Sequence, residues 1–141
     1  MPMEVVKVEE WKKPLPDPDA TARPFYEAAA RGELLYQVCP ACGHRQFYPR
    51  AVCTVCGGDP EWATASGRGS VYTFTIVRQN HAKGFADEVP YAVAMVELDE
   101  GVKMLGRLTG CAVEDVCVGM PLEAYAVEVE DGFALPFWRP A

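Results

Sequence analysis

The sequence lacks the features of a membrane-spanning protein, a secreted protein or a self-sufficient hydrolase. No run of about 18 apolar residues occurs, so we expect no membrane span. The first residues, Met1 to Glu4, are not a basic stretch followed by an apolar one, so we expect no secretory signal. Histidine is scarce, since the chain has only His44 and His81, and neither lies near a G-x-S-x-G segment. We therefore expect no nucleophile–base centre.

The chain also lacks an excess of basic residues. Its formal net charge is −7, from 13 Lys and Arg against 20 Asp and Glu. Residues 1–35 carry a net charge of −2, residues 36–65 of 0, and residues 66–141 of −5. Nucleic-acid-binding proteins take most of their affinity from cations placed on phosphates. The charge distribution therefore disfavours that class, although it leaves room for a local basic patch.

Cysteine, in contrast, is present in a metal-binding spacing. Two C-x-x-C pairs, Cys39 with Cys42 and Cys53 with Cys56, are separated by ten residues. Two such turns facing each other supply four thiolates at ~2.3 Å around one tetrahedral Zn²⁺. A site filled by four thiolates has no open coordination position, so the predicted zinc is structural and not catalytic. It supplies folding free energy to a segment too short to bury its own core.

Several alternatives remain open at this point. Iron in a rubredoxin-like site fits the same four thiols, whereas two disulfides are disfavoured because nothing else in the chain indicates secretion. With cysteine in metal spacing, we expect a cytoplasmic protein. His44 is either a spare ligand or, as we favour, a surface histidine near the ligands. We expect Cys111 and Cys117 to be buried free thiols, and redox chemistry or catalysis with His81 is a minor hypothesis for them.

The first half of the chain divides into an arm and a small metal-binding unit. Residues 1–20 include Pro14, Pro16 and Pro18 and are expected to form an extended arm that is not a packed element. Within it, Trp11 either docks on its own domain or grips a partner protein. Residues 21–65 are expected to hold a helix over 22–30 capped by Thr21, a strand over 34–38, and the ribbon's hairpin around Phe47 and Tyr48.

Residues 66–141 are expected to form a five-stranded domain. Strands are predicted over residues 71–77, 91–98, 102–108, 122–129 and 133–138, with a loop over 78–90 and a crossing segment over 110–119. We expect Tyr72, Phe74 and Ile76 on one face of the first strand, and Gly106 to mark a bulge or a tight bend. This order predicts a mainly β protein with an OB-type barrel, and an open five-stranded sheet is the alternative.

Four ordered motifs together resemble a known family. They are L-x-Y-x-x-C-P-x-C-G at residues 34–43, P-R-x-V-C-x-x-C-G at 49–57, S-G-x-G-x-V-Y at 66–72, and V-P-Y-x-V-A-x-V-E-L at 89–98. Residues 116–121 also resemble the family's V-x-x-G-M-P segment. The combination is similar to the rubredoxin-like zinc-ribbon plus OB-fold family that accompanies acyl-CoA enzymes. The resemblance covers roughly residues 20–140.

The resemblance implies a role as a partner. Members of this family are small non-catalytic subunits of thiolase-superfamily complexes, including acyl-CoA thiolases and the aldolases of steroid side-chain breakdown. It therefore implies a hetero-oligomer with a thiolase-like catalytic subunit, and a CoA or acyl-CoA channel shared with that subunit. The four cysteine ligands match the family's motif residue by residue, whereas its CoA contacts do not match a motif in this sequence.

Two segments are candidates for contacts with a ligand or a partner. The loop between the first two barrel strands mixes cations with an aromatic residue, and OB folds often bind ligands there. Its candidate residues for CoA or partner contact are Arg78, His81, Lys83 and Phe85. A solvated mobile loop is the simpler interpretation. The apolar segment over residues 133–138 is assigned partly to the core and partly to an interface.

The sequence thus favours a non-catalytic accessory subunit of an acyl-CoA thiolase or aldolase. The first alternative is a single-stranded nucleic-acid-binding module, because zinc ribbons and OB folds both bind such strands. A stand-alone acyl-CoA enzyme is the third hypothesis.

Overall fold

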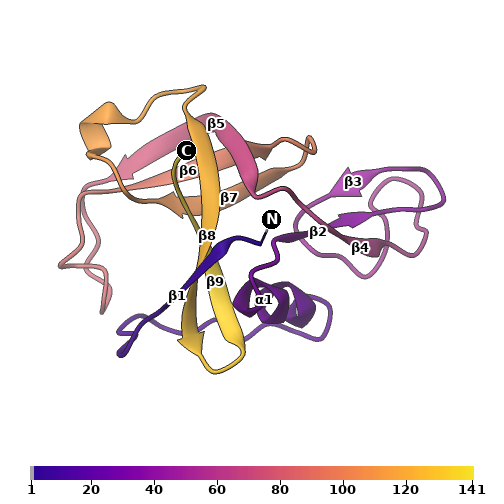
Figure 1. Cartoon of the computed structure of the whole chain (residues 1–141), viewed down its shortest axis with the longest axis horizontal. Helices are drawn as coiled ribbons and strands as arrows, with labels where there is room; N and C mark the ends of the chain where they lie inside the picture. Colours follow the sequence, from indigo (N-terminus) through magenta and orange to yellow (C-terminus); the bar gives the residue numbers. More distant parts are fainter. Residues whose placement is uncertain (1) are drawn as a thin grey trace.

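A computed structural model describes residues 2–141 and shows a β-barrel with a small ribbon at its side (Figure 1). The ribbon consists of β2 (Leu35–Val38), β3 (Arg45–Gln46) and β4 (Glu61–Thr64). The barrel consists of β5 (Arg68–Val77), β6 (Tyr91–Leu98), β7 (Lys103–Leu108), β8 (Pro121–Glu130) and β9 (Phe133–Pro140). A strand β1 (Glu4–Lys7), a helix α1 (Arg23–Ala30) and a 3₁₀ turn η1 (Val113–Asp115) complete the secondary structure.

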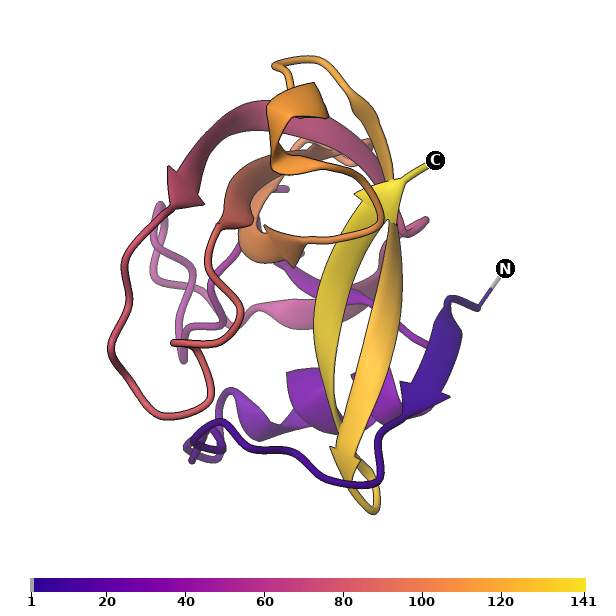
Figure 2. The same ribbon diagram turned by 90° about the vertical axis from the view of Figure 1, so that its left-hand side faces the viewer.

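The barrel is closed and not an open sheet. The strand order is β1-β8-β5-β6-β7-β9, and an additional pairing joins β8 to β9. The β7–β9 contact is parallel and pairs Leu108 with Trp138. Figure 2 shows the strands curving around the barrel interior. This five-stranded closure confirms the OB-type barrel and contradicts the open-sheet alternative.

One hydrophobic core joins the barrel, the helix and the ribbon. Trp138 and Leu98 are fully or almost fully buried at its centre. Phe25 of α1 and Tyr36 of β2 belong to the same cluster of buried side chains. Because the helix and the ribbon share this core with the barrel, the ribbon's position relative to the barrel is set by packing as well as by the chain connection.

The first barrel strand carries a β-bulge that the sequence pattern did not predict. Val71 pairs with Val96, but the next pair along the strand is Thr73 with Met95, so Tyr72 is the extra residue. Its side chain is 53% exposed, while Val71 is buried. The prediction that Tyr72 shares a face with Phe74 and Ile76 is therefore wrong, because a single inserted residue reverses the alternation.

Gly106 does not mark a bulge, which was one of the two expectations for it. The register between β6 and β7 is continuous from Ala92↔Leu108 to Glu97↔Lys103, so no bulge occurs at Gly106. A Cβ at this position would lie 2.5 Å from Cδ1 of Trp138. The glycine is required because the indole ring packs directly on the backbone of β7.

The helix begins one residue later than expected and has a different cap. Asp19 Oδ1 accepts a hydrogen bond from the Ala22 N–H at 2.9 Å, and no side-chain cap bond comes from Ala22, the residue at the N-cap position. The prediction that Thr21 caps the helix is therefore wrong. Pro24 occupies the first turn, where its missing N–H costs nothing.

The N-terminal arm is extended, as predicted, but it is also packed. Strand β1 pairs in parallel with β8, from Glu4↔Tyr125 to Lys7↔Glu128. Further along the arm, the ring of Trp11 lies edge-on to Phe137, with centroids 6.3 Å apart. Trp11 thus docks on its own domain, which decides between the two roles considered for it.

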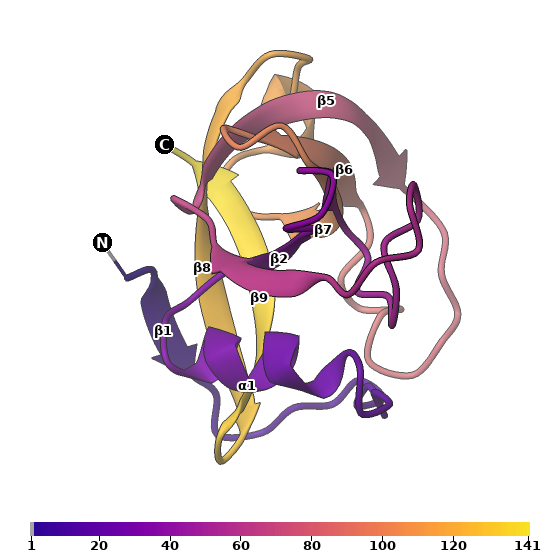
Figure 3. The same cartoon turned by 90° about the vertical axis from the view of Figure 1, so that its right-hand side faces the viewer.

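The ribbon is built around β2, which pairs with β3 on one side and β4 on the other (Figure 1), and Figure 3 shows α1 lying across β8 and β9. The hairpin expected around Phe47 and Tyr48 reduces to two short pairs, Gln37↔Gln46 and Val38↔Arg45. The longer partner is β4, which the sequence analysis missed. In the part of the chain that the structure describes, no helix is long and apolar enough to cross a membrane.

Candidate metal centre and partner-facing surfaces

Two nearly identical turns hold the four cysteines. In the first, the Gly43 N–H donates to the Cys39 carbonyl at 2.7 Å. In the second, the Gly57 N–H donates to the Cys53 carbonyl at 2.9 Å. Both glycines have positive φ, +78° and +77°, which is the left-handed conformation that residues with a Cβ adopt at a cost. The spacing C-x-x-C-G therefore sets the local fold that turns each pair of sulfurs inward.

The sulfurs are close enough to share one metal ion. Cys39 Sγ lies 3.5 Å from Cys56 Sγ, and Cys42 Sγ lies 3.7 Å from Cys53 Sγ. All four sulfurs lie within 4.8 Å of one another. A tetrahedral site with metal–sulfur bonds of ~2.3 Å has sulfur–sulfur distances of about 3.8 Å. The arrangement thus has the dimensions and the donor set of a four-thiolate site.

The thiols influence one another's protonation. The backbone N–H of Cys56 lowers the pKa of Cys53 to about 6, against desolvation that raises it. In Cys42 the backbone hydrogen bond at His44 lowers the pKa, but burial and the neighbouring thiols outweigh it and raise the pKa to about 12. Crowded thiols therefore resist losing all their protons together, and a bound cation removes this obstacle by neutralising the thiolates.

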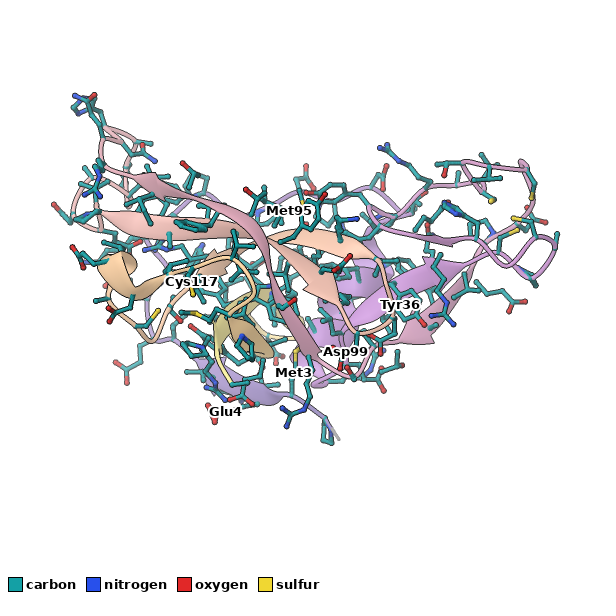
Figure 4. All side chains as sticks on the ribbon, turned by 90° about the horizontal axis from the view of Figure 1, so that it is seen from above. Met3, Glu4, Tyr36, Met95, Asp99 and Cys117 are labelled. Atoms are coloured by element: carbon teal, nitrogen blue, oxygen red, sulfur yellow. The ribbon has the colours of Figure 1, made fainter. Side chains whose placement is uncertain are left out.

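His44, Cys111 and Cys117 are not part of the four-cysteine cluster. His44 Nε2 lies 3.3 Å from Thr54 Oγ1, and His44 is not in the group of potential metal ligands. Cys111 is half-buried and Cys117 is exposed, so the prediction that both are buried is wrong. Figure 4 shows Cys117 in the barrel half of the molecule, far from the sulfurs at the tip of the ribbon.

The loop over residues 78–90 is held down by the N-terminal arm. Lys13 Nζ and Arg107 Nη1 each lie 2.8 Å from a different carboxylate oxygen of Glu88. Burial raises the pKa of Glu88, but the hydrogen bonds from these two cations outweigh it and lower its pKa overall. Lys13 Nζ also lies 4.5 Å from the ring centroid of Trp11 and 5.7 Å from that of Phe85. The arm therefore ties the loop to the barrel.

The four candidate residues of this loop divide into two kinds. Arg78, His81 and Lys83 are exposed, whereas Phe85 is half-buried beside Tyr91, with ring centroids 6.2 Å apart. Figure 1 shows the loop at the end of the molecule opposite to the ribbon. The three exposed residues remain candidates for partner contact, and their distance from the ribbon means that the loop and the metal centre form separate sites.

Sequence reasoning missed an apolar groove between α1, the ribbon and the barrel. It has a volume of about 380 Å³. Six aromatic side chains contribute to its wall, namely Phe25, Tyr26, Phe47, Tyr48, Phe137 and Trp138. Burial raises the pKa of the Tyr26 phenol, and Tyr48 adds to the shift. Tyr48 and Leu105 are about half exposed, so the groove opens to solvent.

Comparison with known families agrees with this architecture. Residues 27–62 match the family described as "ChsH2, rubredoxin-like zinc ribbon domain", and residues 62–127 match "ChsH2, C-terminal OB-fold domain". A "DUF35 domain-containing scaffold protein" of Methanocaldococcus jannaschii is 37% identical over 97 residues, which are 67% of this chain and 68% of that protein. The chain belongs to the ChsH2/DUF35 family. The resemblance noted from the sequence motifs is thereby confirmed.

A solved structure supports the same assignment for this DUF35 protein. The chain in the "Ltp2-ChsH2(DUF35) aldolase" is similar with a TM-score of 0.80 and 32% identity. The match covers 89% of this DUF35 protein and 98% of the other chain. Part of a longer relative matches too. The "3-oxo-4,17-pregnadiene-20-carboxyl-CoA hydratase alpha subunit" of Mycobacterium tuberculosis is 33% identical over 132 residues.

The relatives named as hydratase subunits are much longer than this DUF35 protein. The chain spans 42% of the Mycobacterium tuberculosis subunit. It spans 36% of the "Probable enoyl-CoA hydratase alpha subunit" of Thermomonospora curvata, to which it is 36% identical. The activities named for those longer proteins therefore describe those proteins. For this chain they serve only as the basis of a proposal.

Proposed function

We propose that this chain is a non-catalytic partner subunit of a thiolase-superfamily enzyme that acts on acyl-CoA, either an aldolase or a thiolase. It would form a hetero-oligomer, stabilise the catalytic subunit and help to form its CoA-binding channel. The observation that carries the proposal is the match to the ChsH2(DUF35) chain of an aldolase, which covers 98% of that chain at a TM-score of 0.80. Matching over nearly the whole length makes the same kind of assembly the simplest inference.

We propose further that the four cysteines hold a structural Zn²⁺. The sulfur–sulfur distances and the all-thiolate donor set support this assignment. The four ligands Cys39, Cys42, Cys53 and Cys56 leave no position for a substrate. When bound, the ion would cross-link the two cysteine turns and would take no part in a reaction. Four thiolates also require a reducing compartment, so the cytoplasm is the proposed location.

The chain would work in three parts, with an arm over residues 1–20, the helix and ribbon over 21–65, and the OB-fold domain over 66–141. The arm docks across the barrel and ties down the loop over residues 78–90 through Lys13. We propose two surfaces for contact with a catalytic subunit or its CoA, namely that loop and the apolar groove. The loop offers exposed cationic side chains, and the groove offers partly exposed apolar ones.

Association with a hydratase is a second candidate. A specific observation favours it, because similar sequence occurs within longer chains named as hydratase alpha subunits in Thermomonospora curvata and Mycobacterium tuberculosis. In that case the separate chain would serve a hydratase in place of a thiolase-superfamily enzyme. The two candidates share the accessory role and differ in the identity of the catalytic partner.

Purification of the native complex tests the proposal. We expect the tagged chain to co-purify with a thiolase-superfamily subunit that mass spectrometry identifies. Thiolytic or retro-aldol cleavage of acyl-CoA by that subunit should fall when the chain is left out. A hydratase in its place would favour the second candidate. Full activity of the catalytic subunit alone, together with no complex, would contradict both.

Two further assays address the alternatives considered from the sequence. Titration of a labelled single-stranded oligonucleotide should show no micromolar, salt-sensitive binding, because the chain has a net charge of −7. Turnover of acyl-CoA by the pure chain, lost in His81→Ala, would support an enzyme in place of an accessory subunit.

A further inference from the structure

The N-terminal arm contains a segment that is fixed at both ends and lightly held between them. We call residues 9–18 the strap. On its N-terminal side, β1 pairs with β8 over four residues. On its C-terminal side, the Asp19 carbonyl accepts a hydrogen bond from the Arg23 N–H at 3.0 Å. Figures 1 and 2 show the strap running from β1 past the loop over residues 78–90. The middle of the strap can therefore lift while both ends stay attached.

The backbone of the strap contributes little to its attachment. Residues 9–17 form no backbone–backbone hydrogen bond in the part of the chain that the structure describes. Trp11 Nε1 is buried there without a hydrogen-bond partner, which costs free energy. A cavity of about 460 Å³ separates the strap from barrel side chains that include Val127 and Phe137. A segment with few buried contacts and an unpaired backbone opens at a low cost in free energy.

One side chain makes the main contacts of the strap. The Lys13 side chain is 12% exposed, and its ammonium lies 2.8 Å from a carboxylate oxygen of Glu88 in the loop. The same ammonium lies 4.5 Å from the ring centroid of Trp11, which meets Phe137 edge-on. Lys13 thus joins the strap to the loop and to the ring that rests on the barrel. Loss of any one of these contacts weakens the others.

The loop is also shaped to fit against the strap at Gly84. A Cβ at this position would lie 2.8 Å from the Lys12 carbonyl oxygen and 2.9 Å from Cγ of Lys13. The φ of Gly84 is +87°, in the left-handed region that favours glycine. The loop therefore approaches the backbone of the strap more closely than a residue with a side chain allows. Contacts at Gly84 and at Glu88 together form one surface shared by the strap and the loop.

The loop has its own internal turn, which depends on how Glu88 is held. The Phe85 N–H donates to the Ala82 carbonyl at 3.0 Å, and the Glu88 N–H donates to the Phe85 carbonyl at 2.9 Å. The second carboxylate oxygen of Glu88 lies 2.8 Å from Arg107 Nη1 on β7. When Lys13 leaves, Glu88 keeps one of its two cationic partners and the turn loses its cover.

We propose that the strap and the loop over residues 78–90 are one conformational switch with a closed and an open state. The structure shows the closed state, in which Lys13 holds Glu88. In the open state the strap lifts from the barrel and the loop loosens with it, because the two segments share one contact surface. The loop carries three exposed basic side chains, Arg78, His81 and Lys83. The strap therefore controls whether these cations stand in one arrangement or in many.

Trypsin cleavage and hydrogen exchange follow the two segments separately in the isolated, zinc-loaded full chain. Cleavage after Lys12 reports the strap, and exchange of the hydrogen-bonded amides of Phe85 and Glu88 reports the loop. Lys13→Met removes the ion pair but keeps the length of the side chain and the cleavage site. We expect the initial cleavage rate and the two exchange rates to rise by the same factor, about 5-fold. Unchanged rates would overturn the proposal.

Lys103→Met is the matched control for this variant. Lys103 has an ion pair with Glu97 at 3.8 Å and lies 4.7 Å from the ring centroid of Tyr72, so the substitution removes the same kinds of contact elsewhere on the barrel. Cleavage after Lys12 and exchange in the loop should keep their wild-type rates. An equal rise in the control would trace the effect to net charge or to global stability and would contradict the switch.

Trp11→Ala tests whether the two segments open together. The substitution removes a contact with Phe137, which belongs to the barrel and not to the loop. If the switch is concerted, exchange of the loop amides should nevertheless rise by the same factor as cleavage after Lys12. Faster cleavage with unchanged exchange in the loop would show two independent segments, and the proposal would fail.

Gly84→Ala perturbs the same switch from the loop. We expect cleavage after Lys12 to rise about 10-fold or more, because the new Cβ displaces the strap. Gly101→Ala is its matched control, since φ there is +92° and a Cβ meets nothing within 4 Å. Equal effects of the two variants would assign the change to backbone strain and refute the shared surface.

Exchange of the Val96 amide in the centre of β6 separates local opening from global unfolding. It should stay at the wild-type rate in every variant, and a parallel rise there would replace the switch by global unfolding. All of these measurements use the chain alone. Their outcome is therefore independent of the partner proposed above, and a failure of the switch leaves the proposed function untouched.

Discussion

Replacing Gly106 by alanine should destabilise the protein through one identified contact. The new Cβ would lie 2.5 Å from Cδ1 and 2.8 Å from Nε1 of Trp138. Trp138 is fully buried, so its ring has no free space into which to move. Strand β7 is also fixed, because it pairs with β6 along its length and with β9 at Leu108. Either the ring or the strand must shift.

The cost follows from the general energetics of overpacking. Extra atoms in a packed core cost typically ~1–3 kcal/mol, and a contact this short between two fixed groups belongs in the upper half of that range. For a chain of this size, about 2–3 kcal/mol lowers the Tm by about 4–12 °C. Urea denaturation of zinc-loaded protein, followed by tryptophan fluorescence, measures the loss of unfolding free energy.

A double-mutant cycle identifies the cause of the loss. Trp138→Leu removes the ring, and it sacrifices no hydrogen bond because Trp138 Nε1 has none in the described part of the chain. If the clash is the cause, Gly106→Ala should cost at least ~1 kcal/mol less in the Trp138→Leu background than in the wild type. Equal costs in the two backgrounds would refute the reasoning and assign the loss to the backbone of β7 alone.

Three further predictions concern the metal, the helix cap and the arm. Cys39→Ser should release zinc, as measured by elemental analysis, and should abolish partner binding; binding that survives metal loss would count against a structural role. Asp19→Ala should cost ~0.5–2 kcal/mol because it removes the acceptor of the Ala22 N–H, whereas Thr21→Ala should cost almost nothing. Folding lowers the pKa of Glu88, so its ion pairs stabilise the fold above the unfolded-state pKa of ~4.3 and are lost as the pH falls through the lower folded-state pKa. Because the Glu88 side chain is 36% exposed, Glu88→Gln should cost under ~1 kcal/mol at neutral pH, and the cost should shrink as the pH falls; a cost independent of pH would exclude the ionic contribution.

The features that local chemistry determines were predictable from the sequence. The four cysteines converge because each C-x-x-C-G segment folds into its own turn, and the structure brings their sulfurs together. The strand over residues 91–98 has the predicted bounds, because alternating small and branched apolar residues run between two clear turns. The strands predicted over residues 122–129 and 133–138 likewise correspond to β8 and β9, and the Asp131–Gly132 pair between them is a typical hairpin turn.

The features that depend on distant contacts were not predictable. Strand β4 exists because it pairs with β2, and its own residues, Glu61 to Thr64, show little apolar alternation. The bulge at Tyr72 adjusts the register to partners more than twenty residues away. The role of Gly106 depends on Trp138, which lies more than thirty residues further along the chain. A single sequence contains no local signal for any of these.

The same limit explains why the sequence analysis missed a basic pocket between the ribbon and the barrel, whose wall includes His44, Arg45, Arg50 and Lys103. Arg45 belongs to the ribbon and its hydrogen-bond partner Glu100 belongs to a barrel turn, 55 residues along the chain. Counted by segment, residues 36–65 have no net charge, since Arg45 and Arg50 are offset by Asp59 and Glu61. Folding separates these charges, because the arginines line the pocket and the two acidic residues do not. Charge summed along the sequence therefore hid a local excess that only the fold creates.

This geometry also relates the proposed metal centre to the conformation of the segment between the two cysteine turns. The segment that carries Arg45, Tyr48 and Arg50 runs between the two cysteine turns, so an ion held by the four cysteines would close a loop around it. Closing a loop lowers the number of conformations that the enclosed segment can adopt. The buried side chains of Gln37 and Gln46 hydrogen-bond to each other, and Gln37 also accepts from the Arg50 N–H. These bonds select one of the remaining conformations of the segment. Such an ion would thus contribute to preorganising a surface that it does not touch, while the opposite wall of the pocket is held by the barrel.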